Sequence, residues 1–220
     1  MRSIHVASLA LAAAAAGIAA PATASDEAFE FWLNPSISTD LDENTGVELE
    51  TAQRFRSAED GRADTYFARL WLNQELSDNF TLSGAVEQRI NDGGADERRT
   101  MQQLSARQGI WRGRARLLQR FVDDADRMGL RLQTRGGVAV PLSGDGRWSG
   151  RADAELFWTL RSTSAGGDDG LTGLRTQIGV DYDVSDRLTV GLTYLRQQDF
   201  EDGGPDVVGH APLIGVELSL

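Results

Sequence analysis

Arginine recurs at every second position in one stretch of this chain, at Arg112, Arg114 and Arg116. The positions between them are uncharged, and aromatic residues flank the stretch at Trp111 and Phe121. Successive side chains of a β-strand point to opposite faces, so a strand here would place these guanidiniums on one face. Guanidinium groups bind anions and bridge carboxylates, so such a face could line an anion-selective constriction or form a network of ion pairs.

Side chains that could catalyse a reaction are scarce. After residues 1–24 the chain has one histidine, His210, and its apolar parity predicts a surface imidazole rather than a general base. Asp153 and Glu155 could act as an acid–base pair, but carboxylates two positions apart on a charged strand face more often form salt bridges. Cysteine is absent, which excludes a thiolate metal site. We expect no enzymatic activity, no catalytic residue, no cofactor and no metal site.

The alternation of apolar and polar residues continues in successive segments from about residue 46 to the end of the chain. The helical period fails in most of these segments, so we predict an all-β chain. Residues 112–127 would also suit a helix, but the strict alternation of arginine there favours a strand. The predicted strands are 29–38, 46–56, 64–76, 80–90, 98–107, 111–121, 129–142, 148–161, 172–184, 187–198 and 208–220.

The connections between the predicted strands alternate in length. Short turns rich in Ser, Asp, Asn and Gly alternate with longer acidic loops, as in outer-membrane barrels with short periplasmic turns and long outer loops. The loop carboxylates could bind divalent cations, but they lack the spacing of a defined calcium motif, and charge that keeps a loop solvated is the simpler interpretation. The predicted loops are 57–63, 91–97, 122–128, 162–171 and 199–207.

One parity of the strands carries most of the charge, and a barrel would turn this parity toward its lumen. Charges of both signs in a narrow lumen indicate paired groups that fill the interior, because an unpaired buried ion is costly. The alternative is a narrow or gated pore, since an open aqueous channel needs about sixteen strands. The principal charges predicted to face the lumen are Glu87, Arg89, Arg99, Arg112, Arg114, Arg116, Arg131, Arg135, Arg151, Asp153, Glu155, Arg175 and Asp181.

The other parity carries aromatic residues at two levels. Trp111 and Phe121 are ten positions apart, as are Trp148 and Trp158, which at about 3.3 Å per residue and a tilt near 45° spans roughly 23 Å. The apolar band of an outer-membrane barrel is about 25 Å tall and is bounded by two aromatic girdles. The predicted girdle residues are Phe55, Tyr66, Phe80, Trp111, Phe121, Trp148, Trp158, Tyr182 and Tyr194.

Both ends of the chain carry signals. Residues 1–24 contain a basic residue, an apolar run and the small-residue sequence Ala22-Thr23-Ala24, which predicts a cleaved signal peptide and one mature domain over residues 25–220. The final segment, Gly215 to Leu220, resembles the signal by which the barrel-assembly machinery recognises outer-membrane barrels, with Leu220 in place of the usual aromatic.

Together these patterns predict a single antiparallel, up-and-down transmembrane β-barrel in the outer membrane of a Gram-negative bacterium, surrounded by outer-membrane lipid. The net charge of −11 argues against a nucleic-acid partner, which needs a basic surface. Bacterial barrels have even numbers of strands, so we expect ten or twelve strands, with twelve preferred. The predicted segments above number eleven, so one strand is missed or overcounted. We place this error at residues 25–45, where Pro35 interrupts the pattern.

Several short motifs resemble those of a known bacterial family. They are Phe31-Trp32, Glu97-Arg98-Arg99, Gln102-Gln103, the alternating Arg112 to Arg116, Gln119-Arg120, and Arg175 to Gly179. These motifs resemble the family called domain of unknown function 2490 over nearly all of the mature chain, with Met101 where that family often has an aromatic residue. The resemblance implies an outer-membrane barrel and carries no activity with it.

Two functions are compatible with these patterns. The first is a narrow channel for small solutes or anions, and the second is a closed structural or interaction barrel whose lumen is filled by salt bridges. A soluble periplasmic barrel is a third possibility. It would require the arginine-bearing parity outside and the tryptophan-bearing parity inside.

Overall fold

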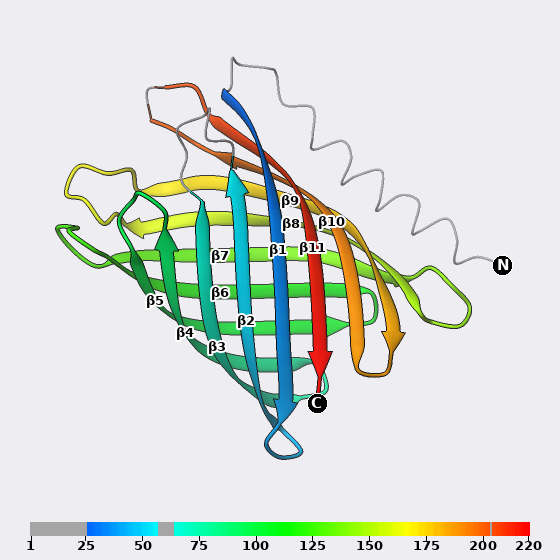
Figure 1. The fold of residues 1–220 in the computed structure, drawn as a ribbon. Coiled ribbons are helices and arrows are strands. Elements are labelled where there is room, and N and C mark those ends of the chain that lie inside the picture. The colour runs from blue at the N-terminus through cyan, green and yellow to red at the C-terminus, as the bar shows by residue number, and fades with distance from the viewer. Residues whose placement is uncertain (1–25, 57–63, 203) are drawn as a thin grey trace.

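A computed structural model describes residues 26–56, 64–202 and 204–220, in which eleven β-strands close into one barrel (Figure 1). The predicted signal peptide at 1–24 and the predicted loop at 57–63 lie outside these residues. None of the described segments forms a helix long and apolar enough to cross a membrane. The strands are β1 (Asp26–Asp40), β2 (Thr45–Arg56), β3 (Thr65–Ser77), β4 (Phe80–Asn91), β5 (Glu97–Gln108), β6 (Trp111–Val122), β7 (Gly129–Pro141), β8 (Trp148–Arg161), β9 (Gly170–Ser185), β10 (Leu188–Asp199) and β11 (Val207–Ser219).

The two faces of the sheet are set by the period-two alternation of the sequence. In β4 the side chains of Val86 and Ile90 are exposed on the outside, while Glu87 and Arg89 are buried inside. An alternating strand must turn one face inward, and here closure of the sheet turns the charged face inward. This orientation is the reverse of the one that a soluble barrel with an apolar core would require.

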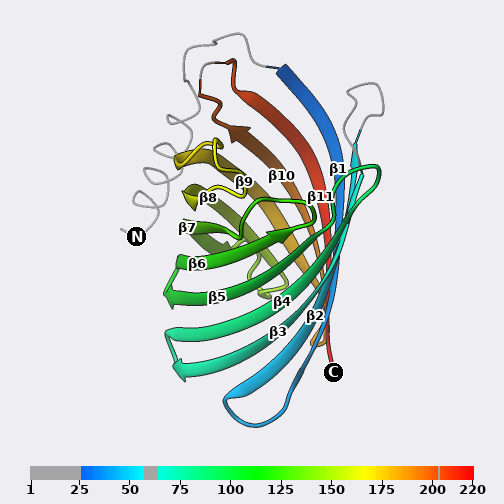
Figure 2. The ribbon, with the colours of Figure 1, turned by 90° about the vertical axis from the view of Figure 1, so that its left-hand side faces the viewer.

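A parallel pairing of β1 with β11 closes the barrel, and it places Phe29 opposite His210 and Pro35 opposite Val216. The other neighbouring strands pair antiparallel. Because consecutive strands alternate in direction, an odd number of strands leaves the first and the last pointing the same way. Figures 1 and 2 show β1 and β11 side by side with the same direction, and the far wall crossing them at a wide angle.

The expectation of ten or twelve strands is therefore wrong, as is that of an entirely antiparallel sheet. The segment containing Pro35 remains a single strand, because only its pairing with β2 is interrupted there, where proline has no N–H to donate. The turn into β2 is formed by Asp42, whose Oδ1 accepts a hydrogen bond of 2.9 Å from the Asn44 backbone N–H. This hydrogen bond lowers the pKa of the Asp42 carboxyl.

The two ends of the barrel have different connections. At the end where β1 finishes, which we call the turn end, residues 41–44, 78–79, 109–110, 142–147 and 186–187 join the strands. In the β5–β6 turn Gly109 has a φ of +57°, which favours glycine at the first central position of a tight hairpin. The opposite end, which we call the loop end, includes the connections 92–96, 123–128 and 162–169. Therefore β1 starts at the loop end and β11 finishes at the turn end.

The outer surface is apolar over most of the barrel and is interrupted on β5 and β6 by Thr100, Gln102 and Gln119, which hydrogen-bond to one another. Phe29 of β1, Leu70 of β3, Trp111 of β6, Ile178 of β9 and Leu192 of β10 are each more than half exposed. Exposed apolar surface this extensive indicates contact with another molecule or a membrane.

Strands β7 and β8 approach each other closely at Gly137. A Cβ atom there would lie 2.5 Å from the Ala152 carbonyl oxygen and closer still to the Cβ of Asp153, whereas one at Gly136 would meet nothing within 4 Å. We expect Gly137→Ala to lower the free energy of unfolding by about 1–3 kcal/mol, because overpacking strains both strands. The matched Gly136→Ala should change it by less than about 0.5 kcal/mol. Urea unfolding in detergent micelles, followed by tryptophan fluorescence, measures both, and equal effects would contradict the close approach.

Candidate functional site

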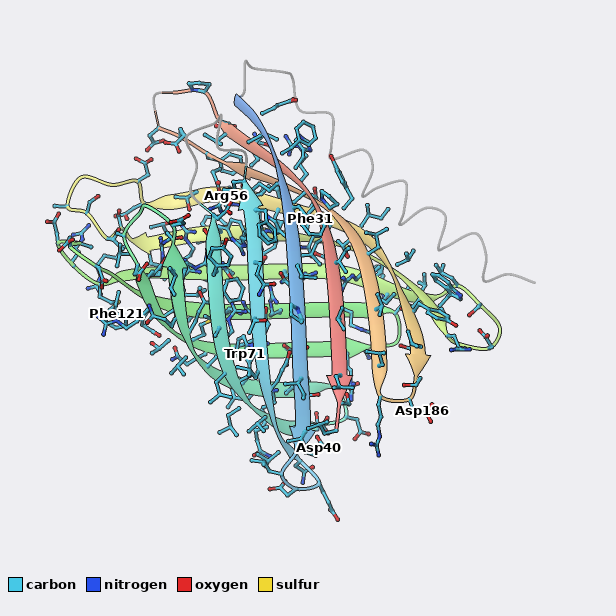
Figure 3. All side chains as sticks on the ribbon, in the orientation of Figure 1. Phe31, Asp40, Arg56, Trp71, Phe121 and Asp186 are labelled. Atoms are coloured by element: carbon cyan, nitrogen blue, oxygen red, sulfur yellow. The ribbon has the colours of Figure 1, made fainter. Side chains whose placement is uncertain are left out.

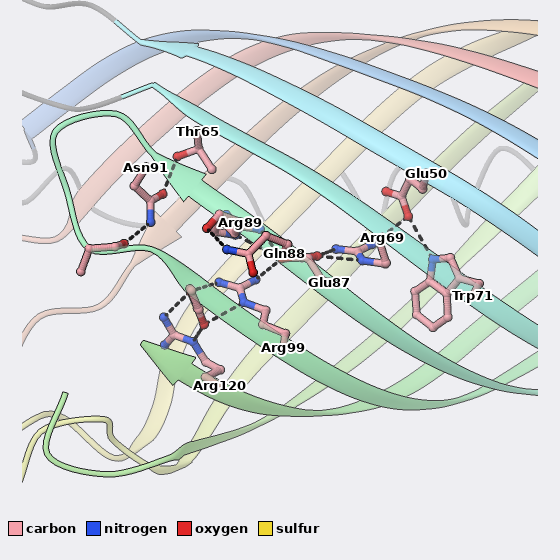
Figure 4. Close-up of polar contacts among 12 residues, drawn as sticks. Glu50, Thr65, Arg69, Trp71, Glu87, Gln88, Arg89, Asn91, Arg99 and Arg120 are labelled. Carbon is pink, nitrogen blue, oxygen red and sulfur yellow. Dashed lines mark hydrogen bonds and ion pairs between the residues drawn. The ribbon is translucent and has the colours of Figure 1, made fainter. Parts of the chain in front are cut away.

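A network of ion pairs lines the interior toward the loop end (Figure 4). At its centre is the Glu87 carboxylate of β4, which is 3% exposed. It accepts hydrogen bonds from Arg69 of β3 and from Arg89 of its own strand. Arg99 of β5 lies 3.5 Å from the same carboxylate, and Arg69 also donates to Glu50 of β2 at 2.8 Å. One network therefore connects four consecutive strands.

Glu97 extends this network, and its prediction as part of an acidic loop is wrong. Its carboxylate is 4% exposed and accepts hydrogen bonds from Arg99 at 2.8 Å and from Arg120 of β6 at 2.6 Å. Two guanidiniums neutralise the carboxylate inside the barrel, so β5 already begins at Glu97. The signal was present in the sequence, because Glu97, Arg99 and Met101 share one parity.

A second network is centred on Glu155 of β8, which is 2% exposed. Arg114 of β6 donates to Oε1, and Arg175 of β9 approaches Oε2 to 3.4 Å. Strands β6 and β8 are separated by β7, so the Arg114 side chain reaches past a strand to make this contact. Arg135 of β7 in turn donates to Asp153 of β8 at 2.5 Å.

Aromatic rings lie in the interior beside these charges. The sequence alone did not predict these inward-facing rings. The Arg54 guanidinium lies 3.8 Å from the centre of the Trp32 ring, and that of Arg175 lies 5.3 Å from the same ring. Arg116 of β6 lies 4.9 Å from the Trp71 ring of β3. The Arg175–Trp32 and Arg116–Trp71 contacts join strands that are not neighbours, so both cross the interior. A guanidinium is attracted to the face of an aromatic ring, so a charged lumen can also be filled with rings.

Each inward tryptophan also belongs to a buried apolar cluster. Trp32 packs with Leu195, Ala211 and Leu213, whereas Trp71 packs with Ala85, Met101 and Leu118. Both indoles donate to carboxylates, Trp32 to Glu30 at 2.6 Å and Trp71 to Glu50 at 3.1 Å. Each cluster therefore packs along neighbouring strands of the inner wall.

The charges predicted to face the lumen lie on the inner parity of their strands. Glu87, Arg89, Arg116 and Glu155 are buried, and Arg112 is exposed. The half-buried members are Arg99, Arg114, Arg131, Arg135, Arg151, Asp153, Arg175 and Asp181.

Only some of these predicted charges form ion pairs with one another. Arg151 and Asp181 form a loose pair of 3.6 Å, in addition to the networks already described. The described residues place no carboxylate within ion-pair distance of Arg112, Arg116 or Arg131. Interior charges that lie outside this set of principal predicted charges include Glu30, Glu50, Arg54, Arg56, Arg69, Glu97 and Arg120.

The predicted girdle residues lie on the outer face, where Tyr182 alone among them is half-buried, against the Trp148 ring at 4.6 Å. At the loop end the rings of Phe31, Phe55 and Tyr66 follow one another across three strands, 6.1 and 6.3 Å apart. The labelled Phe31 and Phe121 can be located in Figure 3.

His210 also lies in this outer aromatic row. Its ring stacks with those of Phe29 at 5.5 Å and Tyr194 at 6.0 Å, and its Nδ1 lies 2.6 Å from the Tyr194 hydroxyl. Within the described residues no group of three or more His, Asp, Glu or Cys side chains is placed to hold a metal ion. Asp153 and Glu155 each have an arginine partner.

Fold and interior together define a closed, mostly antiparallel β-barrel with an apolar outer surface and an ionic interior. The family described as protein of unknown function (DUF2490) matches residues 29–208. The chain belongs to this family, which confirms the resemblance of its short motifs. A comparison with functionally curated proteins finds no match.

The buried Glu155 and the exposed Glu75 are a matched pair of inward-facing glutamates. Glu75 lies 4.0 Å from Arg107, and both side chains are more than half exposed. We expect Glu155→Gln to lower the free energy of unfolding by about 3 kcal/mol, because it leaves Arg114 and Arg175 without their shared counter-ion. Glu75→Gln should lower it by less than about 1 kcal/mol. Urea titration of both variants in the same micelles measures the difference, and a Glu155→Gln variant as stable as Glu75→Gln would refute this role.

Proposed function

We propose that this protein is an outer-membrane β-barrel whose lumen is closed by its own side chains, so that it serves as a structural or binding barrel rather than an open channel. The observation that carries the proposal is the low accessibility of the interior side chains. Trp32 and Trp71 are each 4% exposed, and the charged Glu87 and Glu155 are no more accessible. Ions could not pass these levels without moving paired charges, which is costly.

The apolar outer surface supports the membrane location. Outward-facing leucine, isoleucine and valine side chains suit a hydrocarbon environment, and aromatic rings at both ends suit the two interfaces. The predicted signal peptide at 1–24 supports export, and the terminal segment from Gly215 to Leu220 supports recognition by the barrel-assembly machinery. Outer-membrane lipid is then the main partner of the outer surface.

Cell fractionation tests the location. We expect the protein in the outer-membrane fraction, and we expect its unheated form to migrate differently from its boiled form in SDS gels, because a closed barrel resists SDS until it is heated. A soluble periplasmic protein of similar size serves as the fractionation control. Recovery in the soluble fraction without a heat-dependent shift would reject the membrane proposal.

A narrow passage for small anions is the second candidate function. It is favoured by interior arginines that have no carboxylate within 4 Å among the described residues, namely Arg54, Arg112, Arg116 and Arg131. Unpaired positive charges attract anions. Such a pore would require the rings of Trp32 and Trp71 to move aside.

Planar-bilayer recording separates the two candidates. For the closed barrel we expect no discrete conductance steps in concentrated KCl, and we expect the combined change of Arg112, Arg114 and Arg116 to Gln to reduce stability through loss of the Arg114–Glu155 pair. Arg98→Gln, at an exposed loop-end site, is the control for charge removal. Anion-selective steps that lose their selectivity in the triple variant, but not in the control, would establish the channel instead.

A further inference from the structure

The turn end of the barrel contains a cavity of about 460 Å³. Strands β4 to β9 surround it, and its basic lining residues are Arg107, Arg112, Arg114, Arg135 and Arg151. Its acidic lining residues are Asp153 and Asp181. Five guanidiniums and two carboxylates give a formal charge of +3 (5 − 2), in a chain whose net charge is −11. Glu155 and Glu75, outside the lining, pair with Arg114 and Arg107, which leaves a surplus of +1 (5 − 4) around the cavity of an acidic protein.

The two aspartates do not satisfy these guanidiniums. Asp153 is bonded to Arg135 at 2.5 Å, but Asp181 lies 3.6 Å from Arg151. The Nε of Arg151 is buried and has no hydrogen-bond partner among the described residues, and the same holds for the Nε of Arg114. A buried donor without a partner is costly, so the hydrogen bonding of Arg114 and Arg151 is incomplete.

Arg112 is the least satisfied cation of the cavity. Its Nη1 donates only to backbone carbonyl oxygens, that of Gly109 at 2.6 Å and that of Trp111 at 2.9 Å. No carboxylate of the described residues lies within ion-pair distance. Arg107, beside it in the register of β5 and β6, has its Glu75 partner at 4.0 Å. Both arginines are exposed, whereas Arg114 is only 20% exposed, so the cavity leads from an accessible mouth inward.

We propose that this cavity binds a small anion that carries a phosphate group. A single carboxylate has two oxygens, which one guanidinium can occupy in a bidentate pair. Guanidiniums that converge from several strands and outnumber their carboxylate partners suit an anion with more oxygens and more charge. A phosphate group offers three strong acceptor oxygens and a charge of about −1.5 to −2. The volume also leaves room for an attached organic group.

This inference goes beyond the closed barrel proposed above and does not depend on its location. Binding in detergent micelles reports on the cavity, whereas cell fractionation reports on the membrane, so either proposal can fail alone. The phosphate could belong to a soluble compound or to a lipid headgroup, since both present the same oxygens to the arginines.

Isothermal titration calorimetry of the refolded full chain in phosphate-free micelles tests the proposal. We expect saturable binding of pyrophosphate, weaker binding of inorganic phosphate, and affinity that falls with added salt. Arg112→Gln combined with Arg151→Gln should weaken pyrophosphate binding about tenfold or more, because charge-assisted hydrogen bonds are lost. Arg98→Gln, at the opposite end and 70% exposed, should leave the affinity unchanged.

Heat-dependent gel mobility verifies that each variant is folded. If the double variant does not fold, Arg112→Gln alone remains informative, because that guanidinium has no carboxylate partner among the described residues and its loss leaves no buried acid unpaired. Absence of saturable pyrophosphate binding, equal weakening by Arg98→Gln, or tighter binding of citrate than of pyrophosphate would each overturn the proposal. Competition by phosphatidylglycerol in mixed micelles would assign the phosphate to a lipid headgroup, and lack of competition would assign it to a soluble compound.

Discussion

Neutralisation of charge inside a closed sheet is the constraint on which the rest of this structure depends. Closure places the charged parity of every strand in an interior where an unpaired ion is costly. Glu87, Glu97 and Glu155 meet this constraint, because each bridges guanidiniums from more than one strand. The same bonds restrain the register of neighbouring strands, since a shift by one residue would move each partner to the outer face.

The interior also explains why arginine suits this chain, which has 22 basic residues and no lysine among them. A planar guanidinium can donate along its edge while its face lies on an aromatic ring. Arg175 does both, with Glu155 at 3.4 Å and the Trp32 ring at 5.3 Å. Arg69 likewise combines its carboxylate partners with the Phe67 ring at 4.8 Å. An ammonium group offers no such plane, so rings and charges could not fill the lumen together in this way.

The odd number of strands places the start of β1 and the end of β11 at opposite ends of the barrel. The chain enters β1 at the loop end and leaves β11 at the turn end, and the two strands form a parallel seam. Acidic residues gather in the connections of the loop end, whereas the arginine-lined cavity lies at the turn end. Asp42, Glu43, Asp78, Asp145 and Asp186 lie in the turn-end connections as well, so the two ends differ in the arginine-lined cavity rather than in the sign of their connections.

The sequence alone determined the faces and the approximate bounds of the strands, because period-two alternation is a local property of the chain. It also located eleven strand segments, and only the general rule of even strand numbers, with Pro35 as the suspected break, led to a wrong total. Tertiary structure decided the partners. Arg114 and Glu155 are 41 positions apart and on non-neighbouring strands, and Arg116 meets Trp71 across the interior. Alternation decides that a side chain points into the lumen. Barrel closure and strand tilt decide which other side chain it contacts inside the lumen.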